Sequence, residues 1–98
     1  MKYTVYDLHQ CSKGERIQIT LQGNAANVRL MDSSNYSYYK QGRRHRYYGG
    51  LVRKSPVVFT IPQNGHWYVT IDLGGLGGSV RTAIRRLPTP LSEYRDRA

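Results

Sequence analysis

The residues best suited to chemistry lie between positions 36 and 54 of this 98-residue chain. The run combines tyrosines with cations and contains no carboxylate: Tyr36, Tyr38, Tyr39, Lys40, Arg43, Arg44, Arg46, Tyr47, Tyr48, Arg53 and Lys54. Arginine contacts phosphate through a fixed fork of N–H donors, and a tyrosine ring can stack on a planar base. The combination predicts a surface for an anionic partner, such as nucleic acid, a nucleotide-like ligand or an acidic protein face.

Two sets of residues within this run are expected to act differently. The ligand-binding set is Arg43, Arg44, His45, Arg46, Tyr47, Tyr48, Arg53 and Lys54. Tyrosine and arginine are also the typical hot-spot residues of protein interfaces. Tyr36, Tyr38 and Tyr39 therefore form an alternative interface, through which the chain would form a homo-oligomer or dock on a partner protein. A solvated hairpin whose tyrosines pack on its own sheet is the third interpretation.

Two adjacent glycines, Gly49 and Gly50, divide the end of the run into strand-like halves. Glycine tolerates positive φ at both central positions of a tight turn, so the pair predicts a β-hairpin. In that hairpin Arg46 would face Arg53. Like charges opposite each other are destabilising, and an anion between them would relieve the repulsion.

Other motifs give weaker signals. Structural zinc uses four ligands, usually from paired motifs, whereas this chain has one cysteine and three histidines without that spacing. His9 and Cys11 lie close in sequence and His66 opens an expected strand, but no nucleophile motif surrounds them. The glycines at 74–78 lack the lysine and the following helix of a phosphate loop, which favours a turn. Asp72 lies on the outward side of its strand, where it can pair with an arginine. We expect no catalytic residue, no metal site and no cofactor.

Alternating apolar residues predict the strands that must position the basic run. The expected strands cover residues 2–6, 16–21, 27–31, 57–61, 66–72 and 79–86. Their inward-facing side chains include Ile17, Ile19, Leu21, Val28, Leu30, Val57, Phe59, Ile61, Trp67, Val69, Ile71, Val80, Thr82 and Ile84. Regular spacing favours one all-β domain over residues 1–87, an antiparallel β-sandwich or partly open barrel of about seven strands with one short helix.

The short helix is expected just before the basic residues. Asp32 or Ser33 can cap its N-terminus, Lys40 suits its last turn, and Gly42 follows its end. Beyond residue 87, two prolines and mixed charges predict an extended C-terminal tail or linker over residues 88–98.

The overall composition fits an anionic partner. Fifteen basic and six acidic residues give a formal net charge of +9, which attracts nucleic acid and acidic surfaces. A single cysteine excludes an internal disulfide and favours a reducing compartment. The N-terminal segment lacks the apolar run of a signal peptide, and no apolar stretch is long enough to span a bilayer. We therefore expect a cytoplasmic, non-catalytic recognition module.

Two long segments carry a family resemblance: GNAANVRLMDSSNYSYYKQGRRHRYYGG, residues 23–50, and SPVVFTIPQNGHWYVTIDLGG, residues 55–75. They resemble the bacterial domain of unknown function DUF1883, and the similarity extends from Tyr6 to Leu87. This resemblance implies a small β-rich domain, sometimes fused to a Toll/interleukin-1-receptor domain, which suits a sensing or adaptor module. It implies no particular ligand and no catalytic residues.

Overall fold

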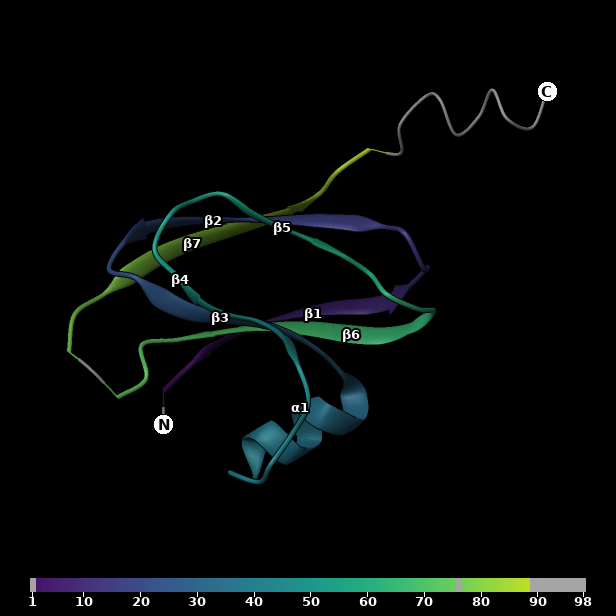
Figure 1. Ribbon diagram of the computed structural model, residues 1–98, viewed down its shortest axis with the longest axis horizontal. Coiled ribbons are helices and arrows are strands. Elements are labelled where there is room, and N and C mark those ends of the chain that lie inside the picture. The colour runs from purple at the N-terminus through teal and green to yellow at the C-terminus, as the bar shows by residue number, and fades with distance from the viewer. Residues whose placement is uncertain (1, 76, 89–98) are drawn as a thin grey trace.

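The computed structural model describes residues 2–75 and 77–88 (Figure 1). In chain order its elements are β1 (Thr4–Cys11), β2 (Arg16–Gly23), β3 (Ala26–Asp32), α1 (Ser33–Lys40), β4 (Tyr48–Val52), β5 (Val57–Thr60), β6 (Gly65–Asp72) and β7 (Val80–Arg86). The expected all-β fold of seven strands with one short helix is confirmed. Apart from Pro88, the tail predicted over residues 88–98 lies outside the described residues.

Two antiparallel sheets face each other and form a sandwich. One sheet has the strand order β1-β6-β3-β4, and the other has the order β5-β2-β7. The described strands form two separate sheets and no closed barrel, which agrees with the expected sandwich. Figure 1 shows α1 on the outer side of the four-stranded sheet, away from the three-stranded sheet. The helix packs beside β3 and β6 and adds a partial third layer.

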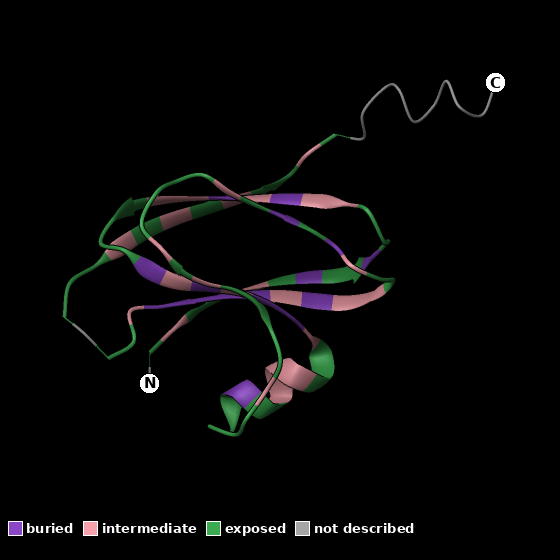
Figure 2. Cartoon of the chain, in the orientation of Figure 1, coloured by how far each residue is buried: buried purple, intermediate pink, exposed green. Residues whose placement is uncertain are grey.

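The core lies between the two sheets, as the alternating pattern predicts (Figure 2). Its most deeply buried members include Ile17, Ile19, Val28, Leu30, Ile61 and Val69. β6 is unusual because it is buried on both faces. Trp67 faces the core, whereas Thr70 and Asp72 are buried on the outer face, where α1 covers the strand. This second buried face carries the polar groups that the candidate site depends on.

The helix begins and ends as expected. Asp32 is the N-cap, and its Oδ1 accepts a hydrogen bond of 3.0 Å from the backbone N–H of Asn35. Lys40 lies in the last turn, and Gly42 follows with a φ of +70°. Among the described residues, no helix is long and apolar enough to cross a membrane.

The tight hairpin predicted at Gly49 and Gly50 is wrong. Both glycines lie inside β4, where they pair with β3. An ideal Cβ on Gly49 would lie 2.3 Å from the carbonyl oxygen of Val28 and 2.8 Å from Cζ of Phe59. The glycine therefore permits close approach of β4 to its neighbours and does not reverse the chain.

The like-charge pair expected in that hairpin is consequently absent. Arg46 precedes β4 and Arg53 follows it, and the five residues of this strand span about 17 Å. Their separation removes the repulsion that an anion between them was expected to relieve.

β1 is longer than its sequence pattern indicates. The expected strand ends near residue 6, whereas β1 continues to Cys11. Its register against β6 shifts between Asp7 and Gln10, and His9 adopts a φ of +58° within this bulge. An extra residue in a strand breaks the two-residue period on which the prediction rests.

Replacing Gly49 with alanine tests whether close packing, and not only the positive φ, requires glycine there. The variant combines a left-handed conformation at φ +104° with a steric clash, so we expect a loss of about 3 kcal/mol in the free energy of unfolding. Gly14→Ala is the matched control, because Gly14 has a φ of +93° and open space around it. Urea denaturation should show a loss of only about 1 kcal/mol for the control. Equal losses in the two variants would contradict the packing argument.

Candidate ligand-binding groove

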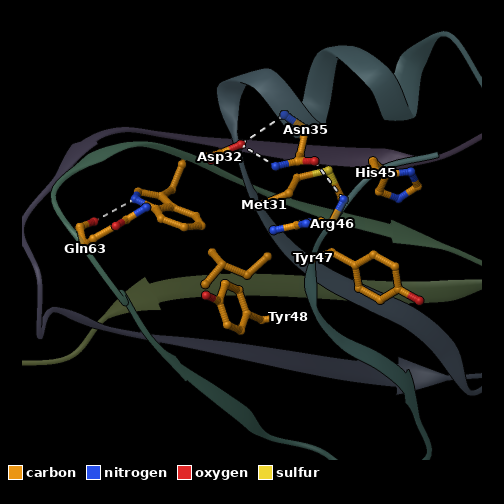
Figure 3. Close-up of a pocket in the computed structure, with 10 residues that line it drawn as sticks. Met31, Asp32, Asn35, His45, Arg46, Tyr47, Tyr48 and Gln63 are labelled. Carbon is orange, nitrogen blue, oxygen red and sulfur yellow. Dashed lines mark hydrogen bonds between the residues drawn. The ribbon is translucent and has the colours of Figure 1, made fainter. Parts of the chain in front are cut away.

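A groove of about 570 Å³ opens where β3 leads into α1 (Figure 3). It is lined by Leu30, Met31, Asp32, Asn35, His45, Arg46, Tyr47, Tyr48, Gln63 and Trp67. Figure 3 shows Gln63 at one end of this cluster and His45 and Tyr47 at the other. Four consecutive residues of the predicted ligand-binding set, 45–48, therefore lie in its wall.

A chain of hydrogen bonds fixes the loop that carries these residues. Asp32 Oδ1 accepts hydrogen bonds from the backbone N–H of Asn35 at 3.0 Å and from its Nδ2 at 2.9 Å. The side-chain oxygen Oδ1 of Asn35 accepts a hydrogen bond of 2.7 Å from the backbone N–H of Arg46. Asn35 thus links the N-cap of α1 to the loop, and the hydrogen bond to its backbone N–H holds Arg46 at the groove.

Aromatic rings form much of the groove wall. Tyr48 lies opposite Leu30 in the β3–β4 register, and its ring centroid is 6.3 Å from that of Trp67. Trp67 Nε1 donates a 3.0 Å hydrogen bond to the carbonyl oxygen of Gln63, so its polar edge is satisfied. Tyr47 and Tyr48 remain 44% and 54% exposed. These two rings are available for stacking with a ligand.

The charges in the groove are only partly balanced. Asp32 is the carboxylate in the wall, and its Oδ1 is already engaged by Asn35. Arg46 is exposed and forms no ion pair with any described carboxylate. The Nδ1 atom of His45 lies 3.0 Å from the carbonyl oxygen of Arg43, whereas its Nε2 is shielded and has no hydrogen-bond partner among the described residues. An incoming ligand would therefore meet the exposed guanidinium of Arg46, which no described carboxylate neutralises.

A buried carboxylate lies on the outer face of the four-stranded sheet, beneath α1. Asp72 accepts hydrogen bonds from Tyr39 Oη and Arg29 Nη1, both at 2.8 Å, from Asn27 Nδ2 at 3.0 Å and from the backbone N–H of Gly74 at 2.8 Å. Burial alone would raise the pKa of Asp72, but these hydrogen bonds and the Arg29 charge together hold its pKa below the ordinary value. Burial, followed by the hydrogen bond to Asp72, raises the pKa of Tyr39, which stays a donor.

This buried network touches two residues of the groove. The guanidinium of Arg29 lies over the ring of Tyr47, 4.9 Å from its centroid. The ring of Tyr39 meets that of His45 edge to face at 5.3 Å. Asp72 therefore positions His45 and Tyr47 through Tyr39 and Arg29, two of the three side chains that bind it.

The remaining ligand-binding candidates are distributed unevenly. Arg43 and Arg44 are exposed in the loop that leads to the groove, and the guanidinium of Arg43 lies 4.8 Å from the ring centroid of Tyr38. Arg53 and Lys54 are exposed after the far end of β4 and do not line the groove. The structure thus brings the 43–48 segment together and leaves Arg53 and Lys54 apart from it.

The three tyrosines expected as an interface have different surroundings. Tyr39 is buried against the sheet. Tyr36 stacks on Tyr68 of β6 at 4.2 Å, and burial raises the pKa of Tyr36 to about 12. Tyr38 is exposed. Tyr36 and Tyr39 pack α1 against its own sheet. Of the three tyrosines, Tyr38 is therefore the one that is exposed for contact with a partner.

Sequence reasoning missed the groove residues that lie outside the basic run. Met31 and Gln63 show no signal of their own, because they approach the loop only in the folded chain. The spacing of Asp32 and Asn35 is the available signal, since residues at these positions often share the hydrogen bonds of a helix N-terminus. Trp67 is a core residue as expected, and one part of it also borders the groove.

Outside the groove, two histidines lie close to a carboxylate, a combination that can take part in acid–base catalysis. His66 Nε2 lies 2.6 Å from Asp7 Oδ1, and His9 Nδ1 lies 3.6 Å from the same oxygen. Among the described residues, no serine, threonine or cysteine side chain is hydrogen bonded to either imidazole.

Comparison with known families identifies the chain. The family model for the domain of unknown function DUF1883 matches residues 1–90, so the chain belongs to that family. Searches among curated proteins and among solved structures found no match. The family resemblance seen in the sequence is confirmed, and membership assigns neither a ligand nor a reaction.

Replacing Asp72 with asparagine tests the buried network. The variant leaves the Arg29 charge without its partner, so we expect a loss of about 3 kcal/mol in the free energy of unfolding near neutral pH. Because the native pKa of Asp72 is lowered, its contribution is present above the unfolded-state value of about 4 and is lost as the pH falls through the native value. Urea denaturation at several pH values should show the difference from wild type shrinking below pH about 4.

Asp32→Asn is the matched control for this experiment. Asparagine caps a helix about as well as aspartate, so the exchange should change stability by less than about 0.5 kcal/mol. A loss for Asp72→Asn that stays constant down to acid pH would contradict the ionised network.

Proposed function

We propose that this DUF1883 domain is a non-catalytic recognition module that binds an anionic ligand carrying a planar group, such as single-stranded nucleic acid or a nucleotide. The single observation that carries the proposal is one concave site in which Arg46, free of any described carboxylate, meets the exposed rings of Tyr47 and Tyr48. The lone cysteine fits a cytoplasmic location, where such ligands are abundant.

The dimensions and chemistry of the groove support this function. Its volume of about 570 Å³ falls in the range of small-ligand sites. Arg46 would pair with a phosphate, and Tyr48 would stack on a base, a contact that contributes about 1–3 kcal/mol. Both roles use exposed side chains of the groove wall.

Exposed cations beside the groove favour a ligand longer than one nucleotide. Arg43 and Arg44 lie in the adjoining loop, and Lys40 lies at the end of α1. Arg53 and Lys54 would contact only a strand that continues past β4. Each phosphate neutralised in this way adds to the salt dependence of binding.

The second candidate function is a protein-interaction or self-association module. Tyr47, Tyr48 and Leu51 are large exposed side chains on or next to β4, at 44%, 54% and 56% exposure. β4 ends its sheet and pairs only with β3 among the described strands, and an apolar edge strand favours contact with another chain.

A binding experiment tests the leading proposal. A fluorescent single-stranded oligonucleotide should bind the wild type at low salt, and its affinity should fall steeply as salt rises. Arg46→Gln removes a charged hydrogen bond worth about 1.5–3 kcal/mol, so we expect a loss of roughly tenfold or more in affinity by fluorescence anisotropy.

Arg85→Gln is the matched control for that experiment, because it makes the same charge change at an exposed position on β7, in the other sheet. It should lower affinity by less than about threefold. Equal losses in the two variants would mean diffuse charge attraction without a site. Absence of binding at low salt would exclude nucleic acid as the ligand.

Mass in solution tests the second candidate. A self-associating chain should form an oligomer that persists at high salt and that Leu51→Lys disrupts, because the charge would be buried in the contact. Analytical ultracentrifugation of both proteins measures this directly. A monomer at every concentration would contradict self-association while leaving the binding proposal intact.

A further inference from the structure

A compact cluster of metal-ligating side chains lies on the edge of the four-stranded sheet, apart from the groove lining. Asp7 and His9 come from β1, and His66 comes from the neighbouring strand β6. One ligand atom from each residue lies within 4.8 Å of the other two. These atoms include Asp7 Oδ1 and His66 Nε2, only 2.6 Å apart, and His9 Nδ1, 3.6 Å from the carboxylate oxygen.

The bulge in β1 creates this cluster. In a regular strand, side chains two residues apart stand about 7 Å from each other. Here the register shifts between Asp7 and Gln10, and His9 takes the left-handed φ of +58°. The same turn brings the backbone N–H of His9 to 2.8 Å from Asp7 Oδ1. A left-handed conformation at a residue other than glycine is uncommon and is concentrated at functional sites.

The second histidine is oriented by stacking. The imidazole of His66 lies on the ring of Tyr68 at 4.8 Å with an interplanar angle of 11°. Tyr68 in turn stacks on Tyr36 of α1 at 4.2 Å. This column of rings limits rotation of His66 and keeps its Nε2 directed at Asp7.

We propose that Asp7, His9 and His66 bind a divalent transition-metal ion such as Zn²⁺, with water completing the coordination. Two imidazoles and a carboxylate suit Zn²⁺ and neighbouring transition metals, whereas Mg²⁺ and Ca²⁺ prefer oxygen ligands throughout. Ligands about 2.0–2.1 Å from Zn²⁺ in a tetrahedron stand about 3.3 Å apart. The observed separations of 2.6 Å and 3.6 Å lie on either side of that spacing, so a bound ion would replace the hydrogen bond between Asp7 and His66 and move these two ligand atoms slightly apart. The three side chains are partly open to solvent, which leaves space for a water ligand.

Calorimetric titration of the intact chain with Zn²⁺ tests the proposal. We expect one ion per chain, with Mg²⁺ and Ca²⁺ giving no comparable binding in parallel titrations. His66→Gln should weaken Zn²⁺ binding by at least roughly tenfold. The chain has three histidines, and His45 is the one outside the cluster, so His45→Ala should retain full Zn²⁺ affinity.

His9→Gly separates metal binding from folding. Glycine adopts a φ of +58° without strain, so this variant should be at least as stable as the wild type while losing a ligand. Zn²⁺ should therefore raise the melting temperature of the wild type and of His45→Ala but leave that of His9→Gly unchanged. A wild type that binds no Zn²⁺, or Zn²⁺ binding that survives both His9→Gly and His66→Gln, would overturn the proposal. Neither result bears on the groove, because nucleic acid plays no part in the measurement.

Discussion

The buried carboxylate of Asp72 is the interaction on which the arrangement of the outer sheet face depends. An ionised group in a protein interior is unfavourable unless charges and hydrogen bonds compensate it. Donors from separate parts of the chain supply that compensation: Arg29 from β3, Tyr39 from α1 and Gly74 from the loop after β6. A helix of eight residues is too short to persist by its own hydrogen bonds. Tyr36 and Tyr39 hold the helix to the sheet, and Tyr39 does so by donating a hydrogen bond to Asp72.

The groove follows from this anchoring. Once α1 is in place, Asn35 directs the loop through the backbone of Arg46, and the residues bound to Asp72 meet His45 and Tyr47. Arg43, Arg44 and Arg46 repel one another, and they are thereby kept within one loop at the groove. That arrangement reduces stability in the free protein, and a bound anion would offset the cost. The proposed function accounts for a surface that folding alone does not favour.

Elements whose order is local could be predicted from the sequence. The period-two strands β2, β3, β5, β6 and β7 and the Asp32 cap depend on neighbours in the chain, and they are found close to where the sequence predicts them. Three features depend on distant contacts and could not be predicted. The glycine at position 49 indicates an unusual backbone conformation. Only the folded position of Phe59 shows that glycine is also required there for close packing. The sequence predicts that Asp72 lies on the outward side of β6. It does not predict that this side is buried, because the burial results from packing of α1 on β6. The meeting of Asp7 with His66, 59 residues apart, is likewise a product of strand pairing.

Trp67 offers the most direct test of the groove, because it is the only tryptophan in the chain and borders the site. Nuclear magnetic resonance of the labelled protein can follow its Nε1–H and the backbone N–H of Arg46 during titration with a single-stranded oligonucleotide. Binding in the groove predicts large, saturable shifts of both signals, with little change at Arg81 and Arg85 on β7. Shifts confined to β7, or spread evenly over all exposed cations, would contradict a defined site.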